Sequence, residues 1–291
     1  MRAAVNASDT SDATAVRAEV NYIRNAPGPG AMKLEFVPHD ETRSTFITHP
    51  GRPVHIANAR GMPCELDREG FTLVPHTSAV TDFDAMQLDF AVDQLYIDEM
   101  TALLTQLTGA SRVLMLGGAK KRYGESATEK LAGLSNAKPA RYPHADNTEA
   151  SAAGLAEFFA QLFDDIDLEA CSRYALYNMW RAFTPPPQDF PLAVCDARTV
   201  APEDEVTVTA LTVEQGGVAM RHDTTGYAYN PAHRWHYYRD MSPAEVLVFK
   251  AHDTDAGRAS RVPHTAFTDP SCPPGTPTRA SVEIRGLALF D

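Results

Sequence analysis

The stretch Tyr142-Pro143-His144-Ala145-Asp146-Asn147-Thr148 places an imidazole and a carboxylate two positions apart, at His144 and Asp146. In an extended strand, residues i and i+2 point to the same face, so both side chains would reach one interior volume. Two histidines and one carboxylate, with further positions left open, form the facial triad of non-heme Fe(II) sites. The stretch therefore predicts two of the three ligands of a metal centre on a strand.

The third ligand of such a site has to come from a distant part of the chain. The best candidate is His264, within Arg261-Val262-Pro263-His264-Thr265. With 10 His and 38 Asp and Glu in 291 residues, chance alone supplies about one His-x-acid triplet. The surrounding sequence therefore has to support the assignment of the three ligands.

A candidate anion clamp follows at Arg279-Ala280-Ser281, which opens the last apolar strand pattern. By the same i, i+2 rule, the guanidinium of Arg279 and the hydroxyl of Ser281 share a face, and together they suit a carboxylate. We interpret the pair as the anchor for the far carboxylate of 2-oxoglutarate, whose keto-acid end chelates the iron. Taken alone, Arg279 would more simply be a surface cation at the start of a strand.

Length and charge limit the class of protein. A chain of 291 residues can bury a large core, and we expect a mobile tail at residues 1–18 followed by one domain at 19–291. Within it, strands and helices of residues 19–139 pack on a core of residues 140–291 that carries the metal site. The net charge of −12 argues against nucleic acid and anionic membranes as partners, since both require clustered Lys and Arg.

The cysteines and the N-terminus indicate the compartment. The four cysteines are widely spaced and form no C-x-x-C pair, which is typical of buried thiols in a reducing cytosol rather than of a zinc or dithiol site. The N-terminus lacks the apolar segment of a signal peptide, and no apolar run reaches membrane-spanning length. We expect a cytoplasmic protein that acts on a small molecule, and the oligomeric state stays open, a homodimer included.

Periodicity predicts two helices and a β-rich second half. Apolar residues recur at helical spacing over residues 92–107, with Gly109 as C-cap, and over residues 152–166, where the aromatic side chains are expected in the core. Short apolar or alternating runs bounded by turn residues predict strands, as a sandwich or jelly roll requires. These runs are residues 112–116, 174–183, 206–211, 235–238, 246–249 and 281–285.

Six motifs within residues 140–290 resemble one family of oxygenases, the group of the 7α-cephem methoxylase CmcJ, the fungal AsaB hydroxylase/desaturase and gibberellin desaturase. The motifs are Asn178–Arg181, Pro191–Arg198, His233–Tyr238, Met241–Lys250, Pro263–Phe267 and Arg279–Arg285. The family tends to carry Glu where this chain has Ala280. That side chain should face away from the co-substrate, so the clamp is retained.

The resemblance implies the α+β fold class, with a double-stranded β-helix (a jelly-roll or cupin-like core) and flanking helices. It also implies Fe(II) as cofactor, with 2-oxoglutarate and O2 as co-substrates. The expected reaction is hydroxylation, desaturation or ring closure of a small specialised-metabolism substrate by C–H abstraction. His144, Asp146 and His264 are then the catalytic metal ligands, and Arg279 and Ser281 bind the co-substrate.

A substrate pocket is harder to assign. A strand that carries Asn178, Trp180 and Arg181 near the mouth of a jelly roll could line the pocket. Alternatively, Trp180 belongs to the core and Arg181 pairs with Asp196. The residues leave both interpretations open.

Two further functions remain as alternatives. The first is an iron-dependent oxidase of the same fold that does not use 2-oxoglutarate. The second is a non-catalytic jelly-roll protein that binds a small ligand, with His144 and Asp146 as ordinary polar residues of the barrel. No residue identifies the substrate, because one fold supports many reactions.

Overall fold

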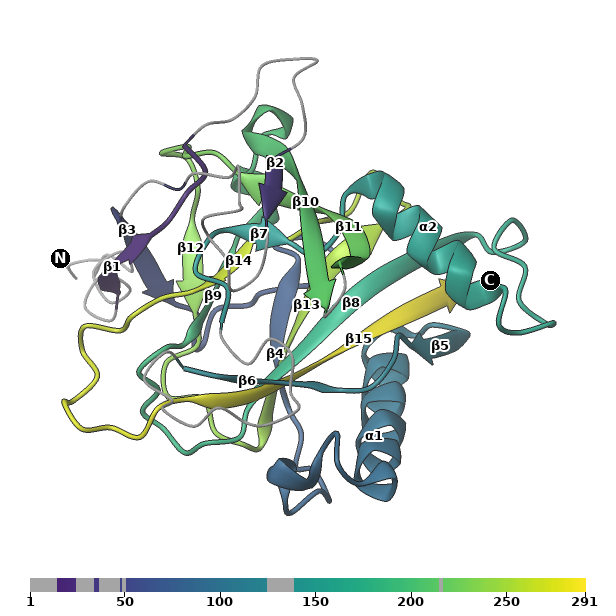
Figure 1. Cartoon of the computed structure of the whole chain (residues 1–291), viewed down its shortest axis with the longest axis horizontal. Coiled ribbons are helices and arrows are strands. Elements are labelled where there is room, and N and C mark those ends of the chain that lie inside the picture. The colour runs from purple at the N-terminus through teal and green to yellow at the C-terminus, as the bar shows by residue number, and fades with distance from the viewer. Residues whose placement is uncertain (1–14, 25–33, 37–47, 49–50, 125–138, 215–216) are drawn as a thin grey trace, which may run out of the picture.

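The computed structural model describes residues 15–24, 34–36, 48, 51–124, 139–214 and 217–291, which form two β-sheets with two main helices (Figure 1). The larger sheet is nine-stranded, in the order β1-β3-β12-β9-β14-β7-β11-β10-β2. Its strands are β1 (Val16–Val20), β3 (Arg52–Asn58), β12 (Trp235–Tyr237), β9 (Leu192–Cys195), β14 (His264–Ala266), β7 (His144–Ala145), β11 (Gly217–Tyr227), β10 (Glu205–Glu214) and β2 (Leu34–Phe36).

The second sheet is six-stranded and contains the long antiparallel pair of strands β8 and β15. Its order is β4-β13-β8-β15-β5, with β6 pairing beside β15. The strands are β4 (Phe71–Pro75), β13 (Glu245–Asp253), β8 (Arg173–Ala182), β15 (Ala280–Phe290), β5 (Arg112–Met115) and β6 (Lys120–Tyr123).

The two sheets face each other across a shared apolar core. One buried cluster joins Val194 of β9 to Phe71, Trp180, Leu247 and Phe249 of the six-stranded sheet. Packing side chains of both sheets into one interior is the arrangement of a jelly roll, because each sheet must bury one face. The predicted architecture, a sheet-rich core with few helices, is therefore what the chain adopts.

Helix α1 (Phe90–Thr108) covers the outer face of the six-stranded sheet. Asp89 caps its start by accepting from the backbone N–H of Ala91, and Gly109 ends it in the left-handed conformation at φ 68°. Its buried residues pack against alternate residues of β8 and β15. The helix predicted at 92–107 with its glycine cap is confirmed.

Helix α2 (Glu149–Ala160) lies on the opposite face of the six-stranded sheet, where it contacts β13 of that sheet and β11 of the nine-stranded sheet (Figure 1). A capping box between Thr148 and Ser151 starts it. The buried residues are Ala152, Ala156 and Ala160, whereas Phe158 is 56% exposed. The prediction of a helix to residue 166 with core aromatics is wrong in both respects, because the small alanine stripe lets the helix pack close to the sheet and turns the aromatic residues outward.

The predicted tail boundary at residue 18 falls inside a strand. Residues 1–14 lie outside the described part of the chain, but Val16–Val20 forms β1 and pairs with β3. Its burial alternates strictly, with Val16, Ala18 and Val20 inside. The boundary at residue 18 is therefore wrong, and the period-two apolar pattern from Val16 was the signal that it overlooked.

The predicted strands of the second half are confirmed, although several are longer than the apolar runs that indicated them. Among the described residues, no helix has both the length and the apolar character needed to cross a membrane.

Candidate metal centre

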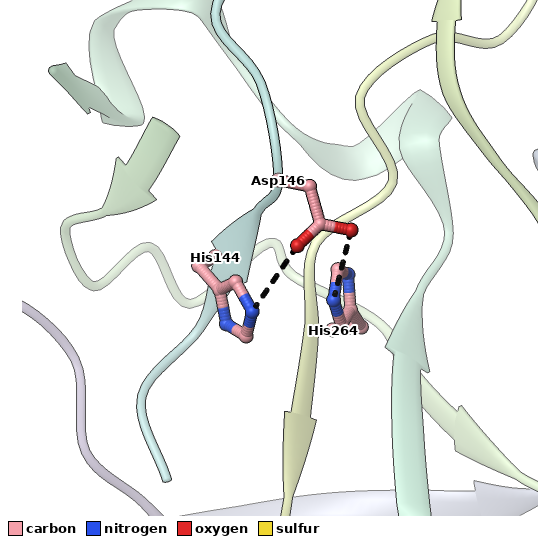
Figure 2. A group of neighbouring side chains, drawn as sticks. All are labelled: His144, Asp146 and His264. Atoms are coloured by element: carbon pink, nitrogen blue, oxygen red, sulfur yellow. Dashed lines mark ion pairs between the residues drawn. The ribbon is translucent and has the colours of Figure 1, made fainter. Parts of the chain in front are cut away.

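Three side chains converge between the sheets: His144 of β7, Asp146 just beyond it, and His264 of β14 (Figure 2). His144 and His264 are direct partners across the antiparallel pair of strands, and their ring centroids lie 4.3 Å apart. The Nε2 atoms of both rings lie 3.9 Å from oxygens of Asp146. One ligand atom from each residue lies within 4.8 Å of the others, and within the described ranges this is the one such group that could hold a metal ion.

Backbone carbonyls orient both imidazoles. Nδ1 of His144 donates to the carbonyl of Tyr142 at 3.0 Å, and Nδ1 of His264 donates to the carbonyl of Val262 at 3.2 Å. With the proton on Nδ1, the lone pair of each Nε2 points toward Asp146, which is the ligating tautomer. Burial, and secondarily His264, lowers the pKa of His144 to about 4, so the ring is neutral as metal binding requires.

The carboxylate of Asp146 is held at both oxygens. The amide of Asn178 donates to Oδ2, and Nη2 of Arg285 lies 2.8 Å from Oδ1. His222 Nε2 donates to the backbone carbonyl of Asp146 at 2.7 Å. Burial raises the pKa of this carboxyl, but the nearby charges, Arg285 foremost, outweigh burial and hold the pKa well below its usual range. Asp146 is therefore ionised, as a carboxylate must be to bind a metal.

The wall of this site is the inward face of β8 and β15. In the antiparallel register, Asn178 lies opposite Arg285, Trp180 opposite Glu283 and Ala182 opposite Ser281. Directly opposed residues of such a pair point to the same side of the sheet. Trp180 also belongs to the core cluster between the sheets, as one of the sequence interpretations had it.

Arg181 lies on the other face of β8. Its guanidinium donates to the carbonyls of His76 and Pro243 and, at 2.8 Å, to Nδ1 of His76. The placement of Arg181 in the pocket with Asn178 and Trp180 is therefore not supported. Its alternative pairing with Asp196 is wrong, because Arg198 takes that carboxylate at 2.7 Å.

Arg279 and Ser281 share a face and contact each other. The guanidinium donates to Oγ of Ser281, and its Cζ lies 5.5 Å from the ring centroid of Trp180. Arg279 is 2% exposed, and burial lowers its pKa to about 10. Among the described residues it forms no ion pair with a carboxylate, and its Nε has no hydrogen-bond partner.

A buried cation without a counter-ion is costly, so this arrangement suits an anionic ligand. The orphaned Nε is a donor that a carboxylate accepts from, and the adjacent hydroxyl of Ser281, which donates to the carbonyl of Arg122 at 3.3 Å, is a second polar group beside it. The residues present therefore fit the far carboxylate of 2-oxoglutarate.

Arg285 and Glu283 were not predicted as site residues. Arg279, just before β15, begins a series of polar residues at every second position that continues with Ser281, Glu283 and Arg285 on β15. This series was visible in the sequence as a period-two polar face. The contact of Asn178 with Asp146 had no such signal, because it depends on which strands are neighbours.

Known proteins resemble this chain over nearly its whole length. A family model described as an oxidoreductase/YMDC permease-like domain matches residues 20–289. Hydroxylase/desaturase EfuI of Hormonema carpetanum is 31% identical over 294 aligned positions, which cover 95% of each chain. The Fe(II)/2-oxoglutarate-dependent dioxygenase NvfI of Aspergillus novofumigatus is 27% identical and covers 92% of this chain and 90% of its own.

The fold is likewise similar to a solved structure. The iron and α-ketoglutarate-dependent endoperoxidase NvfI superposes with a TM-score of 0.81 at 26% identity, covering 96% of this chain and 99% of that one. The likeness confirms the predicted jelly-roll fold class.

Proposed function

We propose that this chain, which belongs to the AsaB-like oxygenase family, is a non-heme Fe(II)- and 2-oxoglutarate-dependent oxygenase. Its family membership is the premise, since the oxidoreductase/YMDC permease-like model matches residues 20–289 of the chain. It hydroxylates, desaturates or cyclises a small specialised-metabolism substrate. The named relatives include hydroxylase/desaturases and an α-ketoglutarate-dependent dioxygenase. The observation that carries the proposal is the convergence of two histidines and one aspartate on a single point.

The donor set fits iron. In this proposal His144, Asp146 and His264 hold Fe(II) as a facial triad, which leaves positions open for co-substrate and oxygen. When bound there with 2-oxoglutarate and O2, the iron supplies the oxidation of an unactivated C–H bond, coupled to conversion of 2-oxoglutarate to succinate and carbon dioxide.

The protein's own part is to hold and orient the reactants. Carbonyls of Tyr142 and Val262 keep the two imidazoles in the ligating tautomer, so no proton has to leave Nε2 before metal binds. Arg279 and Ser281 anchor the far carboxylate of 2-oxoglutarate. This anchor fixes the position of the keto-acid end relative to the triad, which is the geometric contribution that catalysis needs.

Trp180 forms part of the wall beside this anchor. Its ring lies next to the Arg279 guanidinium and faces the interior with Asn178. An aromatic wall excludes water from the guanidinium, which strengthens its attraction for a carboxylate. Asn178 directs its amide N–H to Asp146, so we assign it to holding the metal-ligand carboxylate rather than to substrate alone.

The decisive experiment is anaerobic addition of Fe(II) and 2-oxoglutarate to the purified protein. A visible charge-transfer band is expected with the wild type and not with His144→Ala. The assignment is wrong if no band forms, or if His144→Ala behaves like the wild type.

Two measurements separate the alternatives. Release of succinate coupled to substrate oxidation supports the use of 2-oxoglutarate, whereas oxidation without succinate supports an oxidase of the same fold. Protein purified under reducing conditions that shows no affinity for iron would support a non-catalytic ligand-binding protein.

A further inference from the structure

Arg285 bridges two carboxylates at the edge of the metal centre. Its Nη2 lies 2.8 Å from Oδ1 of Asp146 and 3.1 Å from Oε1 of Glu283, and its Nε lies 3.2 Å from the same Glu283 oxygen. All three side chains are largely buried, with exposed fractions of 25% for Arg285, 10% for Asp146 and 14% for Glu283. One guanidinium, a single positive charge, is therefore shared by two acids in a confined space, and the charges of Lys120 and Arg122 on neighbouring β6 also act on these acids.

The strand register explains why the three groups meet. Glu283 and Arg285 are two positions apart on β15 and point to the interior face that also carries Asn178. Asn178 and Arg285, opposite each other on neighbouring strands, donate to different oxygens of Asp146. Each carboxylate oxygen has about two acceptor sites, so one lone pair on each remains for a metal.

Glu283 is a potential competitor for the metal. The cation that Glu283 pairs with, Arg285, is also paired with Asp146, so a single side chain links the two carboxylates. A facial triad needs two histidines and one carboxylate, and a second carboxylate would occupy a position that the co-substrate needs. In the structure Glu283 is not part of the ligand group, and its carboxylate accepts from Arg285.

We propose that Arg285 is a positioning residue that holds Asp146 toward the two histidines and keeps the Glu283 carboxylate off the metal. This proposal rests on the proposed function, because it concerns the same metal site. One guanidinium can do both, because the N–H groups of its Nη2 donate to Asp146 and to Glu283, and its planar shape fixes the distance between the two carboxylates. Glu283 is therefore a carboxylate near the metal centre that Arg285 keeps from binding the metal.

The test compares two variants, Arg285→Met and the double variant Arg285→Met/Glu283→Gln. Co(II) affinity is measured by its visible absorption, and 2-oxoglutarate binding by the anaerobic Fe(II) charge-transfer band. In Arg285→Met the freed Glu283 carboxylate binds the metal at a position that 2-oxoglutarate needs. The 2-oxoglutarate concentration that gives half of the maximal charge-transfer absorbance should therefore rise at least about tenfold, while Co(II) affinity is largely retained. In the double variant the competing acid is gone, so the 2-oxoglutarate requirement returns to near the wild-type value. Because Asp146 is then less well held, Co(II) binds about 10- to 100-fold more weakly than in the single variant.

Two further variants control for folding. Arg112, on neighbouring β5, forms an exposed ion pair with Asp165 (Nη1–Oδ2 2.6 Å). Arg112→Met removes this pair and should leave the affinities for Co(II) and for 2-oxoglutarate unchanged. If Arg285→Met fails to fold, Arg285→Lys keeps the charge but loses the fork, and it should raise the 2-oxoglutarate requirement less, in the same direction.

The outcomes are distinct from those for the proposed function. Failure of the wild type to form the band rejects the function itself. The role of Arg285 is rejected if the wild type forms the normal band but the single and double variants have the same 2-oxoglutarate requirement and the same Co(II) affinity. A single variant indistinguishable from Arg112→Met rejects it as well.

Discussion

His144 and His264 are direct partners in the β-sheet, 4.3 Å apart between ring centroids, although they come from distant parts of the chain. β7, which carries His144, is only two residues long, and it lies between β14 and β11. A group that binds both imidazoles therefore ties a short central strand to its neighbour. Metal binding and local stability of the sheet should be coupled.

The first prediction is that divalent metal stabilises the protein against unfolding. At free Co(II) about 100 times its Kd, the free energy of unfolding should rise by about 2.7 kcal/mol, because metal binds the folded site and not the unfolded chain. The measurement is urea unfolding with and without Co(II). His264→Ala should abolish the increase, and exposed His55→Ala should retain it; equal increases in both variants would place the metal elsewhere.

The second prediction concerns Gly286, which brings α1 close to β15. A Cβ at this position would lie 2.6 Å from Cδ2 of Leu104, a fully buried side chain. Gly286→Ala should therefore lower the free energy of unfolding by about 1–3 kcal/mol, measured by urea denaturation. The matched control is Gly154→Ala in α2, where a Cβ meets nothing within 4 Å. It should stabilise the protein by about 0.5–1 kcal/mol, and a destabilisation equal to that of Gly286→Ala would contradict the packing explanation.

Local patterns were enough for one half of the site. His144 with Asp146 at the end of β7, and Arg279 with Ser281 at the start of β15, are i, i+2 pairs in extended chain, so the period of a β-strand brings each pair together without knowledge of the fold. The same period would have placed Arg181 on the face opposite to Asn178 and Trp180, and grouping all three was an error of interpretation. The role of each pair as ligand or anchor stays a prediction.

The other half depends on which strands are neighbours. Asn178 reaches Asp146 and lies opposite Arg285 because β8 pairs with β15 in one register. No local period encodes that pairing. The same holds for Phe158, whose exposure follows from the small residues that α2 turns toward the sheet.

The third prediction concerns acid stability of the metal-free protein. Burial, and secondarily Arg181, lowers the pKa of His76 from 6.5 in the folded state. A histidine with a depressed folded pKa favours folding above its unfolded pKa and loses that contribution as pH falls toward the folded value. The wild type should therefore lose more stability than His76→Asn on acidification from about pH 7.5 to 5.5, across the unfolded pKa.

The measurement is urea unfolding of both proteins at each pH. Because Nη2 of Arg181 donates to Nδ1 of His76 at 2.8 Å, protonation would set two cations against each other. Equal losses in the wild type and in His76→Asn would show that this pair does not sense pH.

The last prediction is a trade between stability and co-substrate binding at Arg279. Its guanidinium is buried next to Ser281 and over Trp180, and no carboxylate of the described residues forms an ion pair with it. Replacing a buried, uncompensated charge with an apolar side chain of similar volume is neutral or stabilising, so Arg279→Met should raise the free energy of unfolding by about 1 kcal/mol or more. Loss of a charge-assisted anchor should at the same time weaken 2-oxoglutarate binding by about 10- to 100-fold.

Urea unfolding measures the first effect and anaerobic titration of the Fe(II) band measures the second. Co(II) affinity should stay at the wild-type value, because Arg279 contacts none of the three metal-capable residues. A variant that is less stable and binds 2-oxoglutarate normally would mean that Arg279 is a structural cation, and the carboxylate would then have to be held elsewhere in the site.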